Sequence, residues 1–361
     1  MKTVVVVGDN AIPVTLFKEE FAGLEQKNVA LRWVQWQAPS AAEFSRWTRS
    51  LEQRGPESME APAELVDAVA DCDVLVVHWC PVQSDLVRAA ANLKLVATAR
   101  AGLENLALES LRERRIPIMH ALGRNADTVA DYTVGLLLAE SRNIARGHEL
   151  LRKGEWRRAY PNAEFITDLS DSVVGIVGFG HIGRQVARRL AAFGAKLIGY
   201  DPYVADEAFT SCGVTRVALD DLVARADYVT IHVRLTESTR DLIGRRQLRM
   251  MKPTAYLINT ARAAVVNQEA LAEALQSGHL AGAALDVFEE EPLPPSSPFM
   301  GLSNVTITPH LAGRTVSGYR KGPRMVCNAL CAMASGQRVD ESLLVNADAV
   351  TDELMRKLRV W

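Results

Sequence analysis

The sequence has few cysteines and few aromatic residues, almost no net charge, and no long hydrophobic run. Its five cysteines form no C-x-x-C pair and have no histidine partner at the spacing of a zinc site. Their odd number is typical of reduced thiols, so we expect a cytoplasmic protein in which the thiols are small buried side chains and no metal is bound.

An excess of charge of one sign is also lacking. With 41 Lys and Arg against 43 Asp and Glu, the formal charge is −2, which argues against nucleic acid or an anionic membrane as the main partner. No apolar stretch approaches the ~18 residues of a transmembrane helix, and the run after Met1 is too short for the core of a signal peptide. We therefore expect no nucleic acid and no membrane partner.

What the sequence does have is a regular alternation of short apolar runs with helical patterns. Its 361 residues exceed what one hydrophobic core usually supports, so two domains are expected. Strands are expected first at residues 3–8, 74–78, 93–98 and 116–120, and then at residues 173–177, 196–200, 228–232, 255–259, 281–287 and 305–308. Such alternation predicts parallel sheets that are covered by helices.

Four further segments complete this outline. Residues 37–62 contain several prolines and are expected to form a surface insertion with a weak helical patch. Residues 125–144 are expected to form one long helix that joins the domains. The helical pattern at residues 324–334 is expected to pack back on the first domain, followed by a charged tail at residues 348–361.

A glycine-rich motif marks the start of the second series. The segment G-F-G-H-I-G at residues 178–183 directly follows one expected strand and opens a helix expected at residues 182–193. Gly178 permits a tight turn, Gly180 lets the backbone approach a pyrophosphate, and Gly183 allows the helix to pack closely on the strand. The next strand ends at Asp201, whose carboxylate can bind both ribose hydroxyls and repel a 2′-phosphate. This combination predicts NAD as the cofactor, with a glycine turn that binds no dinucleotide and an S-adenosylmethionine site as the alternatives.

Three later segments each place polar residues after an apolar strand. At the carboxyl edge of the expected sheet, where ligands bind, they bring together Arg262, Asp286 with the acidic run that ends in Glu291, and His310. An arginine, a carboxylate and a histidine that converge there can bind a substrate carboxylate and move a proton. Singly, each has a plainer interpretation, as a solvated cation, a surface charge or a packed histidine. Jointly they favour catalysis.

Together with the glycine motif, these segments resemble the D-isomer-specific 2-hydroxyacid dehydrogenase family over nearly the whole chain. The resemblance implies an α/β protein of two doubly wound parallel-sheet domains, Rossmann-like and flavodoxin-like, with a cleft between them. It implies an NAD-binding Rossmann domain at residues 125–311, inserted into a discontinuous substrate-binding domain at residues 1–124 and 312–361. The cofactor contacts that it implies are Gly178, Gly180, His181, Ile182, Gly183, Asp201, Thr260 and Asp286, with Asp286 at the nicotinamide carboxamide.

The same resemblance implies roles in catalysis. Arg262 would bind the substrate carboxylate and oxygen, His310 would be the general acid/base, and Glu291 would hold and charge His310. The reaction implied is hydride transfer between nicotinamide and C2 of a small D-2-hydroxy acid or 2-keto acid, as in phosphoglycerate dehydrogenases and glyoxylate or hydroxypyruvate reductases. The resemblance also implies a homodimer that forms through the cofactor domains.

The first domain is expected to bind the substrate through Arg100, Ala101 and Gly102, where family members wrap backbone N–H groups around the substrate carboxylate. Arg100 is our candidate for recognising a distal group on the substrate, either a second anion or several hydroxyls beyond C2. The alternative is a guanidinium that faces solvent or pairs with Glu104. His78 and Trp79, at the end of a first-domain strand, fit internal packing and substrate contact equally well.

Three positions depart from the family pattern. Ala263 stands where glycine is usual and would be strained by ~1 kcal/mol if its φ were positive. Asn267 replaces a usual acid, and Arg234 replaces a usual proline. These departures concern cofactor contact rather than the reaction class. The alternative function is an NAD(H)-responsive, corepressor-like binding protein on the same fold.

Overall fold

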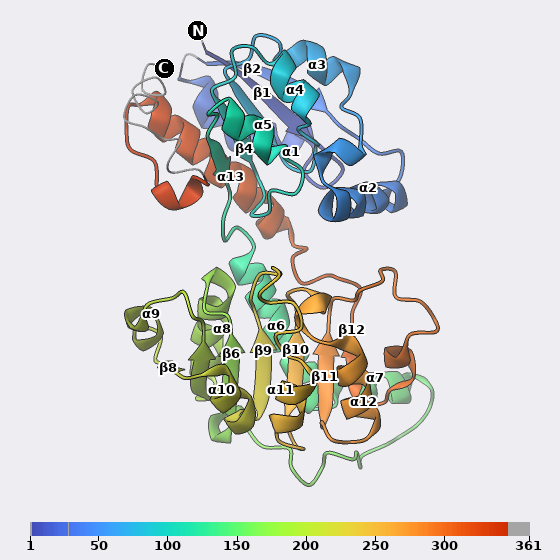
Figure 1. The fold of residues 1–361 in the computed structure, drawn as a ribbon. Helices are drawn as coiled ribbons and strands as arrows, with labels where there is room; N and C mark the ends of the chain where they lie inside the picture. The colour runs from blue at the N-terminus through green and yellow to red at the C-terminus, as the bar shows by residue number, and fades with distance from the viewer. Residues whose placement is uncertain (1, 28, 346–361) are drawn as a thin grey trace. The chain divides into compact units, whose positions relative to one another are not determined.

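The structure, a computed structural model, describes residues 2–27 and 29–345, and its chain divides into two compact units (Figure 1). Unit 1 comprises Met1–Arg124 and Thr315–Trp361, and unit 2 comprises Asn125–Arg314. The tail expected at residues 348–361 lies outside the described residues. In the described part of the chain, every helix is too short or too polar to span a bilayer.

Unit 1 contains a five-stranded parallel sheet with the order β2-β1-β3-β4-β5. Its strands are β1 (Lys2–Gly8), β2 (Val29–Gln35), β3 (Val74–Val77), β4 (Leu95–Thr98) and β5 (Ile118–His120). Both faces are buried: Val5 and Val7 of β1 belong to one hydrophobic cluster, and Val4 and Val6 belong to the other. This period of two with apolar residues on both sides is the pattern of a sheet covered on both faces.

The helices of unit 1 come from both ends of its sequence. They are α1 (Val14–Glu25), α2 (Ala41–Arg54), α3 (Ala63–Val69), α4 (Ser84–Ala89), α5 (Leu108–Glu113) and α13 (Val316–Ala334), with 3₁₀ turns at Pro56–Ser58 and Glu341–Leu343. Glu20 of α1 accepts hydrogen bonds from Arg320 (3.1 Å) and Arg324 (2.8 Å) of α13. Gly322 lies so close to the end of β4 that a Cβ there would clash with the Ala99 carbonyl oxygen. The C-terminal helix is therefore part of the first core.

The segment expected as a surface insertion contains α2, which packs on the core of unit 1. Leu51 is fully buried in the cluster on one face of the sheet. Trp36 lies with its ring centroid 5.0 Å from that of Trp47 and 6.1 Å from that of Phe44. Aromatic contacts of this kind bury large apolar surfaces, so the insertion extends the core instead of standing apart from it.

Unit 2 contains a seven-stranded parallel sheet with the order β12-β11-β10-β9-β6-β7-β8. Its strands are β6 (Val173–Val177), β7 (Lys196–Tyr200), β8 (Thr215–Arg216), β9 (Tyr228–Ile231), β10 (Tyr256–Asn259), β11 (Gly282–Leu285) and β12 (Val305–Ile307). The order reverses at β6, the first strand of the unit, and this is the strand order of a dinucleotide-binding sheet with one added strand. The two sheets confirm the expected α/β class with doubly wound parallel sheets.

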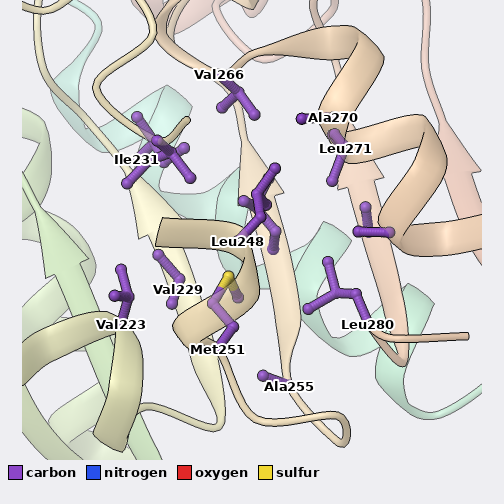
Figure 2. Close-up of a cluster of buried hydrophobic side chains, with 14 of the residues drawn as sticks. Val223, Val229, Ile231, Leu248, Met251, Ala255, Val266, Ala270, Leu271 and Leu280 are labelled. Atoms are coloured by element: carbon purple, nitrogen blue, oxygen red, sulfur yellow. The ribbon is translucent and has the colours of Figure 1, made fainter. Parts of the chain in front are cut away.

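Helices cover both faces of this second sheet. They are α6 (Ala126–Ser141), α7 (Ile144–Arg152), α8 (His181–Ala192), α9 (Asp206–Thr210), α10 (Leu219–Arg225), α11 (Arg245–Met250) and α12 (Gln268–Gln276), with 3₁₀ turns at Leu169–Asp171, Ala263–Val265 and Pro298–Gly301. Helices α6 and α8 share one cluster with the sheet. On the other face, Leu248 and Met251 of the α11 region pack between Val229 of β9 and Leu271 of α12 (Figure 2). Because both faces of the sheet are buried, the positions of its strands, and so of the residues at their ends, are fixed by packing.

The long helix expected at residues 125–144 is two helices. Helix α6 ends at Ser141, and α7 begins at Ile144. Between them Asn143 has a φ of 57°, a left-handed conformation that asparagine tolerates and that stops a right-handed helix. The Asn143 side chain also donates a hydrogen bond to Asn162 Oδ1 (2.8 Å), which fixes the break.

Candidate active site

The glycine motif forms the turn between β6 and α8. Gly178 has a φ of 94°, and a Cβ there would lie 2.7 Å from the backbone of His232. A Cβ on Gly183 would clash with the carbonyl oxygen of Gly178. Gly180, the N-cap of α8, has open space where its Cβ would be. The first and third glycines thus permit the turn and the packing, and the second leaves the helix N-terminus accessible to a pyrophosphate.

Asp201, which follows β7, lies directly against this turn. Its Oδ2 accepts a hydrogen bond from the Phe179 N–H (2.9 Å), and its Oδ1 accepts one from the Tyr203 N–H (3.0 Å). A carboxylate has about four acceptor positions, so two remain for ribose hydroxyls. Asp201 also lines a cavity of about 510 Å³. The donors of the helix N-terminus, the acid and the cavity together fit the adenosine and pyrophosphate of a dinucleotide.

The other residues expected at the cofactor lie at the same end of the sheet. His181 and Ile182 are the first two residues of α8. Thr260 follows β10, is almost fully buried, and shares a hydrogen bond of 2.8 Å with the hydroxyl of Thr133. Asp286 follows β11 and is fully buried. Their contacts with a cofactor remain predictions.

His310, which follows β12, contacts Glu291 in the segment between β11 and β12. The imidazole Nδ1 of His310 lies 3.0 Å from Glu291 Oε2, while Glu291 Oε1 accepts the Phe288 N–H (3.0 Å). Both oxygens of the carboxylate are therefore held. Because a carboxylate only accepts hydrogen bonds, we assign a proton to His310 Nδ1, which donates it to Glu291. The His310 side chain is 41% exposed, so its Nε2 edge can serve an outside partner. His310 also has a φ of 53°, a conformation that is uncommon outside glycine and that clusters at functional sites.

Asp286 holds the loop that carries His310. Its Oδ1 accepts hydrogen bonds from the Thr308 hydroxyl (2.6 Å) and the Leu311 N–H (2.9 Å), and its Oδ2 accepts the Ala312 N–H (2.8 Å). The side chain therefore holds the Thr308 hydroxyl before His310 and two backbone N–H groups after it. The resemblance did not indicate this role.

Arg262 lies in the turn after β10, two strands from β12 in the sheet. The buried Asn259 fixes this turn, because its Nδ2 donates to the Arg262 carbonyl (3.0 Å) and its Oδ1 accepts the Ala261 N–H (3.0 Å). The Arg262 side chain is exposed and donates to the Ala261 carbonyl (2.8 Å). The sequence pattern did not single out Asn259, although it ends an apolar strand just as Asp286 does.

The three departures from the family pattern have simple structural outcomes. Ala263 starts a 3₁₀ turn and is not among the residues with a positive φ, so the expected strain does not arise. Asn267 caps α12 by accepting the Ala270 N–H (2.9 Å), as an acid would. Arg234 is exposed.

In unit 1, Arg100 is enclosed and its side chain is only 7% exposed. Its guanidinium carbon lies 3.1 Å from the centroid of the Trp79 ring, and its nitrogens donate to Asn105 Oδ1 (3.2 Å) and Glu104 Oε2 (3.2 Å). The next residue, Ala101, accepts a hydrogen bond from His120 through its carbonyl (3.0 Å). Arg100 therefore does not face solvent, and it pairs with Glu104, as the alternative interpretation expected.

Of the two interpretations left open for His78, the structure supports internal packing, in a buried group that includes Asp9, which the sequence pattern did not single out. Asp9 after β1 accepts hydrogen bonds from His78 Nδ1 (2.9 Å) and the Trp79 N–H (2.8 Å), and both side chains are fully buried. Burial alone would raise the pKa of Asp9, but His78 and the backbone N–H groups hold it below its ordinary value. Burial lowers the pKa of His78 to about 4, and Arg124 lies 3.4 Å from its Nε2. His78 is thus an internal packing residue, and the polar ends of β1 and β3 were the signal for it.

Comparison with known proteins supports the same assignment. The family model described as "D-isomer specific 2-hydroxyacid dehydrogenase, NAD binding domain" matches residues 134–312. The chain is 38% identical over 301 residues to D-3-phosphoglycerate dehydrogenase of Methanocaldococcus jannaschii, covering 82% of this chain but only 56% of that relative. It is 36% identical to glyoxylate reductase of Korarchaeum cryptofilum, covering 80% of this chain and 92% of that protein.

A solved structure shares the fold as well. The NAD-complexed D-isomer specific 2-hydroxyacid dehydrogenase of Lactobacillus delbrueckii ssp. bulgaricus superposes with a TM-score of 0.74 at 24% identity, covering 96% of this chain and all of that one. The chain therefore belongs to the D-isomer specific 2-hydroxyacid dehydrogenase family, and NAD is its cofactor.

Proposed function

We propose that the chain transfers a hydride between the nicotinamide of NAD and C2 of a small D-2-hydroxy acid or 2-keto acid, with His310 as the general acid/base. The observation that carries the proposal is the contact of 3.0 Å between His310 and Glu291, at the same sheet edge as the glycine turn. A histidine oriented by a carboxylate on one nitrogen and accessible on the other is the arrangement needed for proton transfer to a substrate oxygen.

Each residue has a defined part in this reaction. NAD, when bound, accepts or supplies the hydride. Gly178, Gly180 and Gly183 make room for its pyrophosphate, and Asp201 binds the ribose. Thr260 and Asp286, which directly follow β10 and β11, contact the nicotinamide half. The Nε2 of His310 takes the proton from the C2 hydroxyl, or returns it to the C2 oxygen, while Glu291 stabilises the charged ring. Arg262 binds the substrate carboxylate with its guanidinium fork.

The decisive experiment is a panel of 2-keto acids with NADH: glyoxylate, hydroxypyruvate, a phosphorylated keto acid and a four-carbon keto acid. We expect turnover of at least one of them, and we expect His310→Ala to lower kcat by about 10²–10⁴-fold with an unchanged NADH Kd. A His310→Ala enzyme that turns over normally, or an enzyme that binds NADH but reduces none of the acids, would contradict the proposal. The second result would favour the binding-protein alternative.

For the substrate, we propose an acid that carries a second anionic group, which Arg100 recognises. Arg100 stands in the loop that is expected to hold the substrate carboxylate, and Glu104, which is 40% exposed, is the partner that a second anion would have to replace. Ala101 and Gly102 in the same loop would bind the substrate carboxylate through their N–H groups. In the keto-acid panel, Arg100→Ala should lower kcat/KM for the phosphorylated acid about 10- to 100-fold more than for glyoxylate, which has nothing beyond C2. Equal losses would assign Arg100 to loop support alone.

We also propose that the chain forms a homodimer through unit 2. Helix α7 has no buried residue, although its sequence is amphipathic. Ile144 is 59% exposed, Leu151 is 55% exposed, and Trp156 in the segment that follows is 81% exposed. A group of large apolar side chains on one short segment is typical of an interaction surface.

A further inference from the structure

The cavity at the end of β7 contains a cation beside the acid that binds the ribose. Its lining residues are Tyr200, Asp201, Pro202, Asp206, Arg216, Val217 and Ala218. In dinucleotide sites, an arginine near the ribose is the usual receptor for the extra phosphate of NADP, and an acid there selects NAD. This chain has both residue types in one cavity, so the arginine needs an explanation.

The side chain of Arg216 is held on two sides. Its Nη1 lies 2.5 Å from Asp206 Oδ1, and its Nη2 donates to the Asp201 carbonyl (3.1 Å). Asp206 is the first residue of α9, the short helix between β7 and β8. The ion pair therefore takes up the guanidinium charge at the wall of the cavity.

The helix that carries Asp206 is itself fixed by the glycine turn. Phe209 of α9 stacks on Phe179 of the turn, with ring centroids 4.2 Å apart and planes 11° apart. A Cβ on Gly199 of β7 would lie 2.8 Å from the Phe209 ring, so α9 packs as closely as the strand allows. The guanidinium carbon of Arg216 lies 5.6 Å from the centroid of the Phe209 ring. Asp206 and Arg216 thus have set positions relative to the cofactor turn.

We propose that Asp206 is a second determinant of cofactor choice, which acts by pairing with Arg216 and so preventing this cation from receiving a 2′-phosphate. Asp201 repels the 2′-phosphate directly, whereas Asp206 occupies the Arg216 guanidinium that would otherwise bind it. The inference rests on the binding of NAD and not on the proposed reaction, so a binding measurement tests it whichever acid the enzyme reduces.

The test is the Kd for NADPH and NADH, measured by titration calorimetry in an Asp201→Ser background. There we expect Asp206→Asn to tighten NADPH binding about 3- to 10-fold, the scale of one exposed charge pair, and to leave NADH binding within about 2-fold. The gain should disappear when Arg216→Ala is added and should shrink at high salt, because the pair is solvent-exposed.

Glu207→Gln is the matched control, since it removes the same charge from the next position of α9 and does not line the cavity. We expect it to leave the NADPH Kd unchanged. Equal gains from Asp206→Asn and Glu207→Gln, or a gain that survives Arg216→Ala, would show a general charge effect and overturn the proposal. So would the absence of any gain from Asp206→Asn.

Discussion

At the scale of residues, His78 with Asp9 and His310 with Glu291 are two histidine–carboxylate pairs of the described residues that differ in burial. His78 Nδ1 lies 2.9 Å from Asp9, and His310 Nδ1 lies 3.0 Å from Glu291. The His78 side chain has no exposed surface, whereas that of His310 is 41% exposed. The same two functional groups therefore serve as a packing element in unit 1 and as our candidate for proton transfer in unit 2. Residue type alone does not separate these roles; access to the second ring nitrogen does.

The buried pair predicts how the stability of unit 1 depends on pH. Because the pKa of His78 is lowered to about 4, the unfolded chain takes up a proton between about pH 6.5 and pH 4 that the folded chain does not. As the pH is lowered through this window, the free energy of unfolding should decrease by up to about 1.4 kcal/mol per pH unit. His78→Gln should flatten that part of the dependence.

Urea unfolding followed by tryptophan fluorescence measures this, since Trp33, Trp36, Trp47 and Trp79 all lie in unit 1. His148→Gln, at an exposed position of α7, is the control and should keep the wild-type slope. An identical slope in the His78→Gln protein would mean that another group causes the acid sensitivity.

Glu291→Gln tests the second pair. Glutamine can still accept the hydrogen bond from His310 but cannot stabilise a charged ring, so kcat should fall about 10- to 100-fold while KM and the NADH Kd stay within 2-fold. Steady-state kinetics and NADH fluorescence titration measure both quantities. Glu290→Gln removes the neighbouring exposed charge and should behave as the wild type. A loss confined to KM would assign Glu291 to substrate binding instead.

At the scale of elements, the strand ends were the most predictable feature. Buried parallel strands are continuous apolar runs, so their polar ends are visible in the sequence, and the residues after β7, β10, β11 and β12 include the predicted Asp201, Arg262, Asp286 and His310. The sequence did not predict strand β2, because it lies at the edge of the sheet. Its apolar run is interrupted by exposed residues such as Arg32. The break between α6 and α7 depends on the φ of Asn143, which no periodicity records.

The contacts within the site could not be predicted in the same way. The hydrogen bond from the Phe179 N–H to Asp201 connects the ends of neighbouring strands, and so do the bonds from the His310 loop to Asp286. Both therefore depend on how the strands are ordered in the sheet. The pairing of Asp206 with Arg216 depends on the packing of α9 against Gly199. Sequence spacing identifies the residue types at a sheet edge, and packing decides which of them touch.

The turn between β6 and α8 predicts different effects for two alanine substitutions. Gly183→Ala should lower the free energy of unfolding by about 1–3 kcal/mol, because its Cβ would clash with the Gly178 carbonyl. Gly180→Ala should fold as stably as the wild type, because its Cβ meets open space, yet bind NADH at least tenfold more weakly where the pyrophosphate must approach. Thermal melts and NADH titration compare the two proteins. Equal stability of both variants would contradict the packing role of Gly183.

At the scale of the whole molecule, the dimer proposed through α7 can be tested by light scattering. The wild type should elute with twice the mass of one chain, and Leu151→Ser with Trp156→Ser should give single chains, because these changes replace two exposed apolar side chains of the segment with polar ones. Met300→Ser, at another exposed apolar position of unit 2, should leave the mass unchanged. A wild type that elutes as a single chain would refute the proposed dimer.

The division of unit 1 between both ends of the chain has a consequence for synthesis on the ribosome. Glu20 of α1 can pair with Arg320 only after 300 further residues have been synthesised. Unit 2, in contrast, is one continuous segment that leaves the ribosome before α13 does. Domains fold as they emerge, so the inserted unit can reach its native state while the N-terminal sheet still lacks its last helix. Once folded, unit 2 also brings its two ends to fixed positions, which shortens the loop that must close when α13 docks on α1. We therefore expect the middle of this protein to fold before its two ends come together.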